Sequence, residues 1–326
     1  GYVEFKRALF TTVQEELAAF LDPETERLIS AQELLWGGVK VDGIPPLNEP
    51  AFVTPAEAAE WIDSADRVIG VEINGDARAY PLRIIDWHEM VNDTVGGVPV
   101  SLAYCTLCGS AILYDGRVGD TVYRFGTSGL LYRSNKLMYD RETRTLWEQY
   151  TGVPVWGELA GSGIELDILP VTHATYGEWL REHPETRVLD IRTGFPRNYT
   201  PGAAYGDYFD SPQLMFPAPD RSGTLQPKTV VYTVRYGGET VAYPVAELAR
   251  RGFIEDEIDG TPVVVLSTAD GLGGRAYLAT GLAVGTYDAE AKTLTDRAGQ
   301  IWTATEAALT GPGGAALERV PGHNSF

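Results

Sequence analysis

The feature that most constrains the fold of this chain is an internal repeat. Residues 67–114 align without a gap on residues 230–277, so that Tyr80 falls on Tyr243 at an offset of 163 residues. Glycine and proline positions follow the same offset, as with Gly97 and Gly260. Because a fixed offset over such a length indicates repeated structural units, we expect two tandem, diverged copies of one unit.

Each copy begins with an alternating run, VIGVEINGDARAYPL or VVYTVRYGGETVAYPV, with Asn-Gly or Gly-Gly at its centre. This pattern predicts a β-hairpin with a tight turn. A short helix-like piece follows (IIDWHEMVND or AELARRGFIED), and then a Val-rich strand. We therefore predict a β-rich α+β fold, in which two copies of a small β-sheet or barrel-like unit carry short peripheral helices.

Helical spacing appears in FKRALFTTVQEELAAFL, TPAEAAEWIDSA and HATYGEWLREHP. Together, the helical spacing and the repeat predict that the chain is divided into four regions. They are a helical or extended lead-in over 1–66, the first repeat unit over 67–191, an ordered connection over 192–227 and a second, degenerate repeat unit over 228–326.

The formal charge of −19 over 326 residues excludes nucleic acid and anionic membrane surfaces as partners. It favours a solvated acidic surface over a docking face for a basic partner. No run approaches the roughly 20 apolar residues that cross a bilayer, so we expect no membrane insertion of the given chain, which shows no leader. The sequence leaves the oligomeric state open.

The two copies differ most where polar chemistry is concentrated. His88, Cys105 and Cys108 of the first copy are replaced in the second by Arg251, Thr268 and Gly271, while the surrounding apolar pattern persists. Since the second copy manages without these residues, we expect a functional role for them, and we take them as the candidate catalytic residues.

A C-x-x-C pair either shares a metal ion or closes a small disulfide ring, and both options are open. Structural zinc is disfavoured because a second pair is lacking, and a thioredoxin-like site because the pair follows a strand and leads into another. Thiolates with an imidazole suit copper, and a thioether often completes such sites. The expected metal set is therefore His88, Cys105, Cys108 and Met138, with copper as the cofactor and zinc or no metal as alternatives.

We accordingly expect a copper-binding protein, and favour a copper-dependent oxidoreductase. Two other interpretations are open. One is a non-enzymatic binding module in which Cys105 and Cys108 form a disulfide, and the other is a thiol-based hydrolase or transferase that uses Cys105 with His88. The residues also have plain structural alternatives, as packed cysteines, a core methionine and a satisfied histidine.

The segment FGTSGLLYRSNKLMYDRETRTLWEQ joins a Gly-rich turn to polar side chains and is compatible with a pocket for a small-molecule substrate. Its candidate binding residues are Tyr139, Asp140 and Arg141, with Glu89 beside His88. The alternative is a turn and a strand with solvated charges. No loop of the kind that cradles phosphate is present, so a nucleotide cofactor is not expected.

The remaining histidines, His173, His183 and His323, are expected to have surface or capping roles. His173 and His323 lie in similar settings, LPVTHATY and RVPGHNSF, and so are expected to be equivalent positions of the repeat.

The stretches WHEMVNDTVGGVPVSLAYCTLCGSAILY and FGTSGLLYRSNKLMYDRETRTLW resemble the proteins of the domain of unknown function 3179 family. The resemblance is strong over residues 42–185 and extends to the connection and the second copy. It supplies no reaction, but it implies that His88, Cys105, Cys108 and Met138 belong to one pattern. Thr106 departs from the proline expected there. Members often look exported, which implies an extracytoplasmic location.

Overall fold

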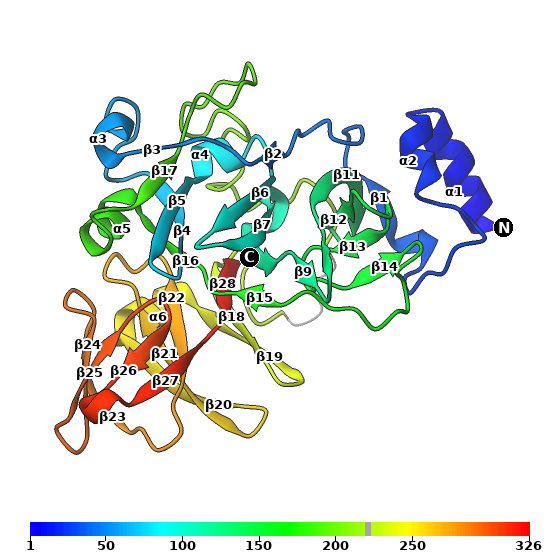
Figure 1. The fold of residues 1–326 in the computed structure, drawn as a ribbon. Helices are drawn as coiled ribbons and strands as arrows, with labels where there is room; N and C mark the ends of the chain where they lie inside the picture. Colours follow the sequence, from blue (N-terminus) through cyan, green and yellow to red (C-terminus); the bar gives the residue numbers. More distant parts are fainter. Residues whose placement is uncertain (219–222) are drawn as a thin grey trace. The chain divides into compact units, whose positions relative to one another are not determined.

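The computed structural model describes residues 1–218 and 223–326 and divides into two compact units (Figure 1). Over these residues, 28 strands accompany only six short α-helices, which confirms the β-rich class. Each unit is assembled from three separate stretches of chain. Unit 1 comprises Gly1–Ala51, Arg83–Leu169 and Ile191–Pro227, and unit 2 comprises Phe52–Leu82, Pro170–Asp190 and Lys228–Phe326.

The compact units therefore do not follow the four regions expected from the sequence. The first hairpin, β4 (Arg67–Ile73) and β5 (Asp76–Pro81), belongs to unit 2, whereas the strands that follow it belong to unit 1. The reason is strand pairing: β4 pairs with β16 (Thr172–Thr175), and β5 pairs in parallel with β17 (Arg187–Leu189). Both partners come from the end of the region that the repeat assigns to the first copy.

Element bounds agree with the offset found in the sequence. Strand β5 corresponds to β19 (Glu239–Pro244), and β6 (Met90–Val95) to β20 (Phe253–Ile258), each at 163 residues. The turn between β4 and β5 has positive φ angles at Asn74 (51°) and Gly75 (81°), as a tight hairpin requires. The repeat itself stays a prediction, with which these bounds agree.

Two five-stranded sheets form unit 1. The first, antiparallel throughout, has the order β1 (Leu34–Trp36), β11 (Phe125–Tyr132), β12 (Asn135–Asp140), β13 (Leu146–Glu148) and β14 (Pro154–Trp156). The second has the order β15 (Ile168–Leu169), β8 (Ser110–Asp115), β7 (Val98–Cys105), β6 and β2 (Leu47–Asn48). A small hairpin, β9 (Arg117–Val118) and β10 (Thr121–Val122), extends from β8.

Strand β12 shows how the core of unit 1 is arranged. Leu137 and Tyr139 pack in a cluster with helices α1 (Tyr2–Thr11) and α2 (Glu15–Ala19), whereas Met138 packs in another with Met90 and Trp147. Because successive side chains of a strand point to opposite faces, the sheet is buried on both sides. The expected N-terminal helix is confirmed, with a break after Thr11.

Unit 2 contains three sheets. One has the order β16, β4, β5, β17 and β3 (Phe52–Val53); a second has β19, β18 (Val231–Tyr236) and β28 (Gly322–Ser325). The eight-stranded sheet has the order β20, β21 (Thr261–Ser267), β22 (Gly274–Leu278), β27 (Ala316–Val320), β26 (Ala308–Thr310), β25 (Ile301–Ala304), β24 (Thr293–Asp296) and β23 (Val284–Asp288). Its helices are α3 (Pro55–Ala58), α5 (Tyr176–Glu182) and α6 (Val245–Arg251).

The helix-like piece IIDWHEMVND is only partly helical. Helix α4 (Leu82–Ile85) is a single turn, and β6 begins at Met90, because the apolar residues there continue the sheet. The expected helices at 54–65 and 173–184 are α3, which begins with a capping box between Thr54 and Glu57, and α5. Of the connection 192–227, residues 219–222 lie outside the described part.

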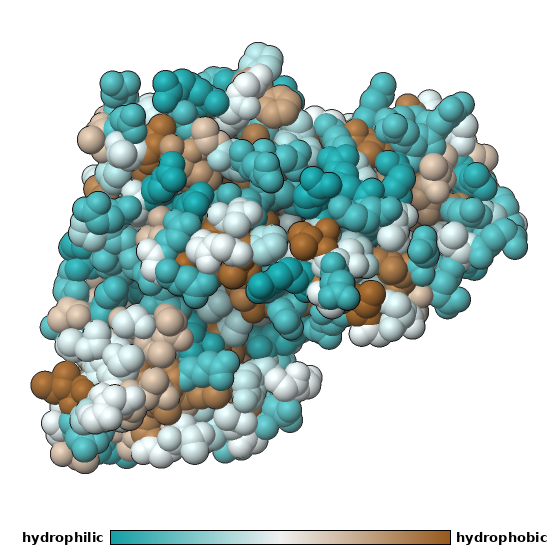
Figure 2. Space-filling view, viewed as in Figure 1, coloured by the Kyte–Doolittle hydropathy of each residue, from teal (hydrophilic) through white to brown (hydrophobic). Residues whose placement is uncertain are grey.

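Among the described residues, no helix has the length and apolar character that a membrane crossing would need. The face of the molecule in Figure 2 is covered largely by hydrophilic residues, with hydrophobic ones scattered among them, as the formal charge of −19 leads one to expect.

Candidate functional site

Unit 1 contains a cavity of about 380 Å³, which we call the dithiol pocket. Its polar wall includes Cys105, Asp86, Glu89, Lys136 and Tyr205. Its apolar wall includes Ile44, Leu107, Leu130, Leu131, Leu137 and Phe216. Cavities of this size that combine apolar walls with a few polar groups are typical of sites for small molecules.

The C-x-x-C pair occupies the turn between β7 and β8, as the sequence predicts. Strand β7 ends at Cys105, and a single 3-10 turn over Thr106–Cys108 leads to Gly109. Gly109 has the left-handed conformation (φ 58°), which glycine adopts without steric cost, and Ser110 opens β8. The turn folds back tightly enough to bring the two sulfur atoms together.

The Sγ atoms of Cys105 and Cys108 lie 2.7 Å apart, and both cysteines are free thiols. Burial raises the pKa of Cys105 well above its usual value, and the bond to Cys108 adds to this effect. The hydrogen bond from Cys105 lowers the pKa of Cys108. The lowered pKa makes the thiolate, the form in which cysteine is nucleophilic, easier to form on Cys108 than on Cys105.

A second layer of polar groups fixes the position of Cys108. Asn135 Nδ2 lies 3.4 Å from Cys108 Sγ and donates to Gln149 Oε1 at 2.7 Å. Gln149 is fully buried and donates to the carbonyl oxygen of Ala103 at 2.8 Å. The amide of Asn135 is therefore held against the sulfur, where it favours the thiolate.

A buried ion pair lies beside Cys105. Lys136 Nζ is 3.5 Å from Glu89 Oε2 and donates to the Glu89 carbonyl oxygen at 2.9 Å, and burial lowers the pKa of Lys136. The other carboxylate oxygen of Glu89 accepts from Tyr205 Oη at 2.9 Å and from Thr106 Oγ1 at 3.2 Å. Glu89 has φ 55°, a conformation that costs a side-chain-bearing residue about 1–2 kcal/mol.

Asp86 is a third acid–base group of the pocket. Burial raises its pKa to about 7, an effect that Glu89 increases and a hydrogen bond with Tyr104 opposes. Asp86 Oδ1 is buried without a hydrogen-bond partner. A carboxyl group that titrates near neutral pH in a pocket is suited to donate or accept a proton there.

His88 does not join the two cysteines. Its Nδ1 lies 2.7 Å from the carbonyl oxygen of Pro45, which only accepts, so Nδ1 carries the proton and Nε2 accepts from Tyr199 Oη at 2.6 Å. The side chain is fully buried, and burial lowers its pKa. In the part of the chain that the structure describes, the ligand atoms of His88, Cys105 and Cys108 do not gather within 4.8 Å of one another.

The other expected site residues are distributed differently. Met138 is fully buried in an apolar cluster. Asp140 accepts from Trp147 Nε1 at 2.7 Å and from Thr143 Oγ1 at 2.9 Å, and so closes a turn. Tyr139 and Arg141 both donate to Asp42 at 2.7 Å. The Gly-rich segment does line the pocket, through residues 127–131, Lys136 and Leu137. Of the four binding residues expected from the sequence, Glu89 lies on the wall of the pocket.

The connection after residue 191 contributes two tyrosines to the site that were not predicted from the sequence. Tyr205 bonds to Glu89, and Tyr208 Oη donates to the Leu107 carbonyl oxygen at 2.9 Å, within the C-x-x-C turn. Asp86 and Lys136 were also not selected. The available signal was Lys136 itself, a charge directly before the apolar run of Leu, Met and Tyr in NKLMYD.

The expected surface or capping role is wrong for His173 and His323, whereas His183 has the capping role. His173 and His323 are buried in unit 2, on β16 and β28, and burial lowers the pKa of each to about 3. Their registers differ by one residue. His173 pairs with Ile69 and His323 with Thr233, which corresponds to Gly70 at the repeat offset. The two are therefore not equivalent positions. His183 caps α5 but is also nine-tenths buried.

These features define a β-rich protein with a cavity of about 380 Å³ and an adjacent pair of cysteines. Residues 41–326 match the model of a family described as "Protein of unknown function (DUF3179)". The chain belongs to this family, which confirms the resemblance seen in the sequence. Comparison with curated proteins and with solved structures finds no match.

Proposed function

We propose that the dithiol pocket is a thiol–disulfide redox site, in which Cys105 and Cys108 exchange two electrons with a small disulfide or dithiol compound. The observation that carries the proposal is the 2.7 Å contact between the sulfurs on a turn that borders the pocket. No helix terminus is required for reactivity, because Cys105 and Asn135 lower the pKa of Cys108 instead.

Cys105 lines the pocket, and Cys108 lies next to it on the same turn. The reaction is balanced as follows. The Cys108 thiolate attacks one sulfur of a disulfide bound at this turn, whose S–S bond breaks, and the released thiolate takes up a proton. Cys105 then attacks Cys108 Sγ, breaks the mixed disulfide, and passes its proton to the second leaving thiolate. The products are a Cys105–Cys108 disulfide and two thiols, and a second dithiol compound restores the reduced protein by the reverse steps.

The test is a redox titration of the purified chain in thiol–disulfide buffers, with free thiols counted by alkylation and mass spectrometry. Both thiols should disappear together in a two-electron step. Cys105→Ser should accumulate a mixed disulfide on Cys108, whereas Cys108→Ser should react slowly or not at all. Persistence of both thiols in strongly oxidising buffer, in protein with native circular dichroism, would contradict the proposal.

Copper binding is our second proposal, because two sulfurs on one turn are the ligands that Cu(I) prefers. The hydrogen bonds of His88 and the packing of Met138 favour a site with the two sulfurs alone. The test is a Cu(I) competition titration. Binding should be lost in the Cys105→Ser, Cys108→Ser double variant and retained in Met138→Leu. Equal binding by the double variant would refute the sulfur site.

The resemblance to exported proteins supports an extracytoplasmic location as part of this proposal, since disulfide exchange suits oxidising compartments. Fractionation of cells that express the complete gene tests it. Recovery of the protein with the cytoplasmic fraction would contradict it.

A further inference from the structure

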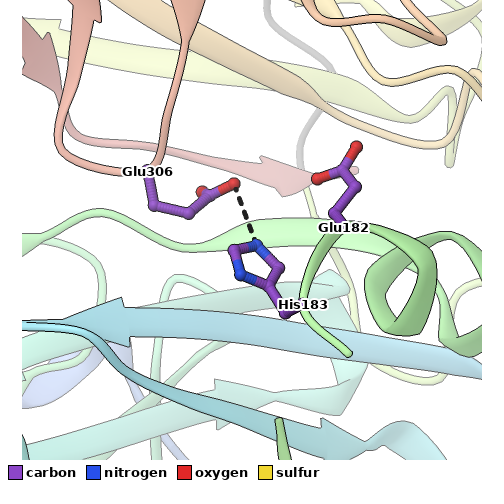
Figure 3. A group of neighbouring side chains, drawn as sticks. All are labelled: Glu182, His183 and Glu306. Atoms are coloured by element: carbon purple, nitrogen blue, oxygen red, sulfur yellow. Dashed lines mark ion pairs between the residues drawn. The ribbon is translucent and has the colours of Figure 1, made fainter. Parts of the chain in front are cut away.

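A separate group of side chains in unit 2 has the character of a metal site. Glu182 is the last residue of α5, His183 caps that helix, and Glu306 lies in the loop between β25 and β26. One ligand atom from each lies within 4.8 Å of the others. Figure 3 shows the side chains converging from the helix end and from that loop. The metal site expected from the sequence consists of residues of unit 1 and includes none of these three.

The orientation of His183 leaves one ring nitrogen available. Its Nδ1 lies 3.1 Å from Glu72 Oε2, and its ring stacks on Trp179 with centroids 3.9 Å apart. A histidine that binds a metal through one nitrogen usually donates from the other to a carboxylate. Nε2 has no hydrogen-bond partner, although the side chain is 90% buried, and it faces Glu306 Oε1 at 3.6 Å.

Glu182 offers a second buried atom without a hydrogen-bond partner. Its side chain is only 1% exposed, and Oε2 accepts from Lys292 at 3.2 Å and from Arg275. Oε1 accepts no hydrogen bond, and Arg181 is 3.8 Å from it. A buried carboxylate oxygen without a donor is unfavourable unless a cation or a water molecule satisfies it.

Both carboxylate oxygens of Glu306 are held by surrounding donors. Its Oε2 accepts from Thr172 Oγ1 at 2.7 Å and Arg319 at 2.9 Å, and its Oε1 accepts from Arg275 Nε at 2.8 Å. A second nitrogen of the Arg275 guanidinium also lies 2.8 Å from Oε1, so a metal at this oxygen must replace one of the two Arg275 contacts. Hydrogen bonds of this kind orient metal-binding carboxylates.

The charge of the surroundings is nearly balanced. Four cations, Arg181, Arg275, Arg319 and Lys292, contact the carboxylates of Glu182 and Glu306, and Glu72 adds a third carboxylate beside His183. The side chains of Arg275 and Arg319 are 1% exposed, whereas those of Lys292 and Arg181 are 18% and 45% exposed. A divalent ion therefore requires that Arg181 or Lys292 turns away from Glu182 into solvent.

We infer that unit 2 binds one divalent ion of the Zn²⁺ class through Glu182 Oε1, His183 Nε2 and Glu306 Oε1. One imidazole and two carboxylates are ligands that Zn²⁺ accepts at about 2.0–2.2 Å, which places neighbouring ligand atoms about 3.4 Å apart in a tetrahedral site. The 3.6 Å between His183 and Glu306 is close to this spacing. The ion joins the end of α5 to the β25–β26 loop, which are far apart in sequence.

The test uses the Cys105→Ser, Cys108→Ser double variant of the full chain, so that the other soft ligands are absent. After treatment with a chelator, the protein is dialysed against Zn²⁺ and the bound metal is measured. One Zn²⁺ per chain is expected, with Mn²⁺ bound more weakly. His183→Gln and Glu182→Gln should abolish binding, whereas Glu72→Gln should weaken it about 10–100-fold. The exposed Glu290→Gln serves as the matched control.

Two results would overturn the inference. One is the absence of Zn²⁺ from the folded double variant, and the other is unchanged affinity in both His183→Gln and Glu182→Gln. Either would identify the group as a buried ion-pair network only. If His183→Gln does not fold, Glu182→Gln and Glu72→Gln carry the test, since both retain the shape of the side chain. The melting temperature should rise with Zn²⁺ in the double variant and not in Glu182→Gln.

Discussion

Cys105 Sγ and Cys108 Sγ lie 2.7 Å apart, and the two groups have opposite pKa shifts, because burial raises the pKa of Cys105 while the contact lowers that of Cys108. Of the two thiols, Cys108 has the lowered pKa and so forms a thiolate more readily than the buried Cys105. The asymmetry assigns the roles in exchange chemistry: Cys108 attacks first and Cys105 resolves the mixed disulfide.

Removal of the Cys105 thiol should therefore change the rate at which Cys108 is alkylated. In Cys105→Ala the pKa of Cys108 should rise, because the thiolate loses the hydrogen bond that is the largest cause of its lowered value. The midpoint of the pH–rate profile for alkylation of Cys108 by iodoacetamide should move to higher pH. Cys105→Ser, which keeps a donor, should move it less. The same midpoint in Cys105→Ala and wild type would contradict the assignment.

The pair of Lys136 and Glu89 should matter far more to stability than exposed pairs do. Their side chains are 6% and 10% exposed, so Lys136→Met leaves a buried carboxylate without its cation, at a cost of about 3–5 kcal/mol. Arg133→Gln, which breaks an exposed pair with Glu33, is the matched control and should cost less than about 1 kcal/mol. Urea denaturation measures both. Equal losses, or no recovery in the Lys136→Met, Glu89→Gln double variant, would contradict the buried pair.

Met138 should behave as a core residue. It is fully buried between Met90 and Trp147, so Met138→Ala should destabilise the protein by about 2–5 kcal/mol, and Met138→Leu by less than about 1.5 kcal/mol. Denaturant midpoints give both values. If Met138→Leu weakens Cu(I) binding while the fold is unchanged, the four-ligand copper set expected from the sequence regains support.

The local features of the site were predictable from sequence, and the tertiary ones were not. The C-x-x-C turn and the Asn74-Gly75 hairpin have signals within a few residues, because turn geometry depends on local residue types. Glu182 and Glu306 are distant in the sequence, and no spacing rule connects them. The interleaving of the two units likewise depends on which strands pair, as β5 does with β17. The roles of His88 depend on Pro45 and Tyr199, which meet it only in the folded chain.

Asp86 should make stability depend on pH in a direction opposite to that of most carboxylates. Its pKa is raised from 3.8 to about 7 by burial, with Glu89 adding to the rise and Tyr104 opposing it. Between about pH 4 and 7 the folded chain therefore holds a proton that the unfolded chain has lost, so this group favours folding less as the pH rises. The full effect above pH 7 is about 4 kcal/mol at most.

Asp86→Asn tests this expectation, since the amide retains the shape of the carboxyl group and does not titrate. The free energy of unfolding of the variant relative to wild type should rise as the pH increases from 5 to 8, because only wild type must ionise a buried carboxyl group. Contributions from the other titrating groups cancel in the difference. A difference that does not change with pH would show that Asp86 is ionised throughout, which would remove it as a proton donor of the dithiol pocket.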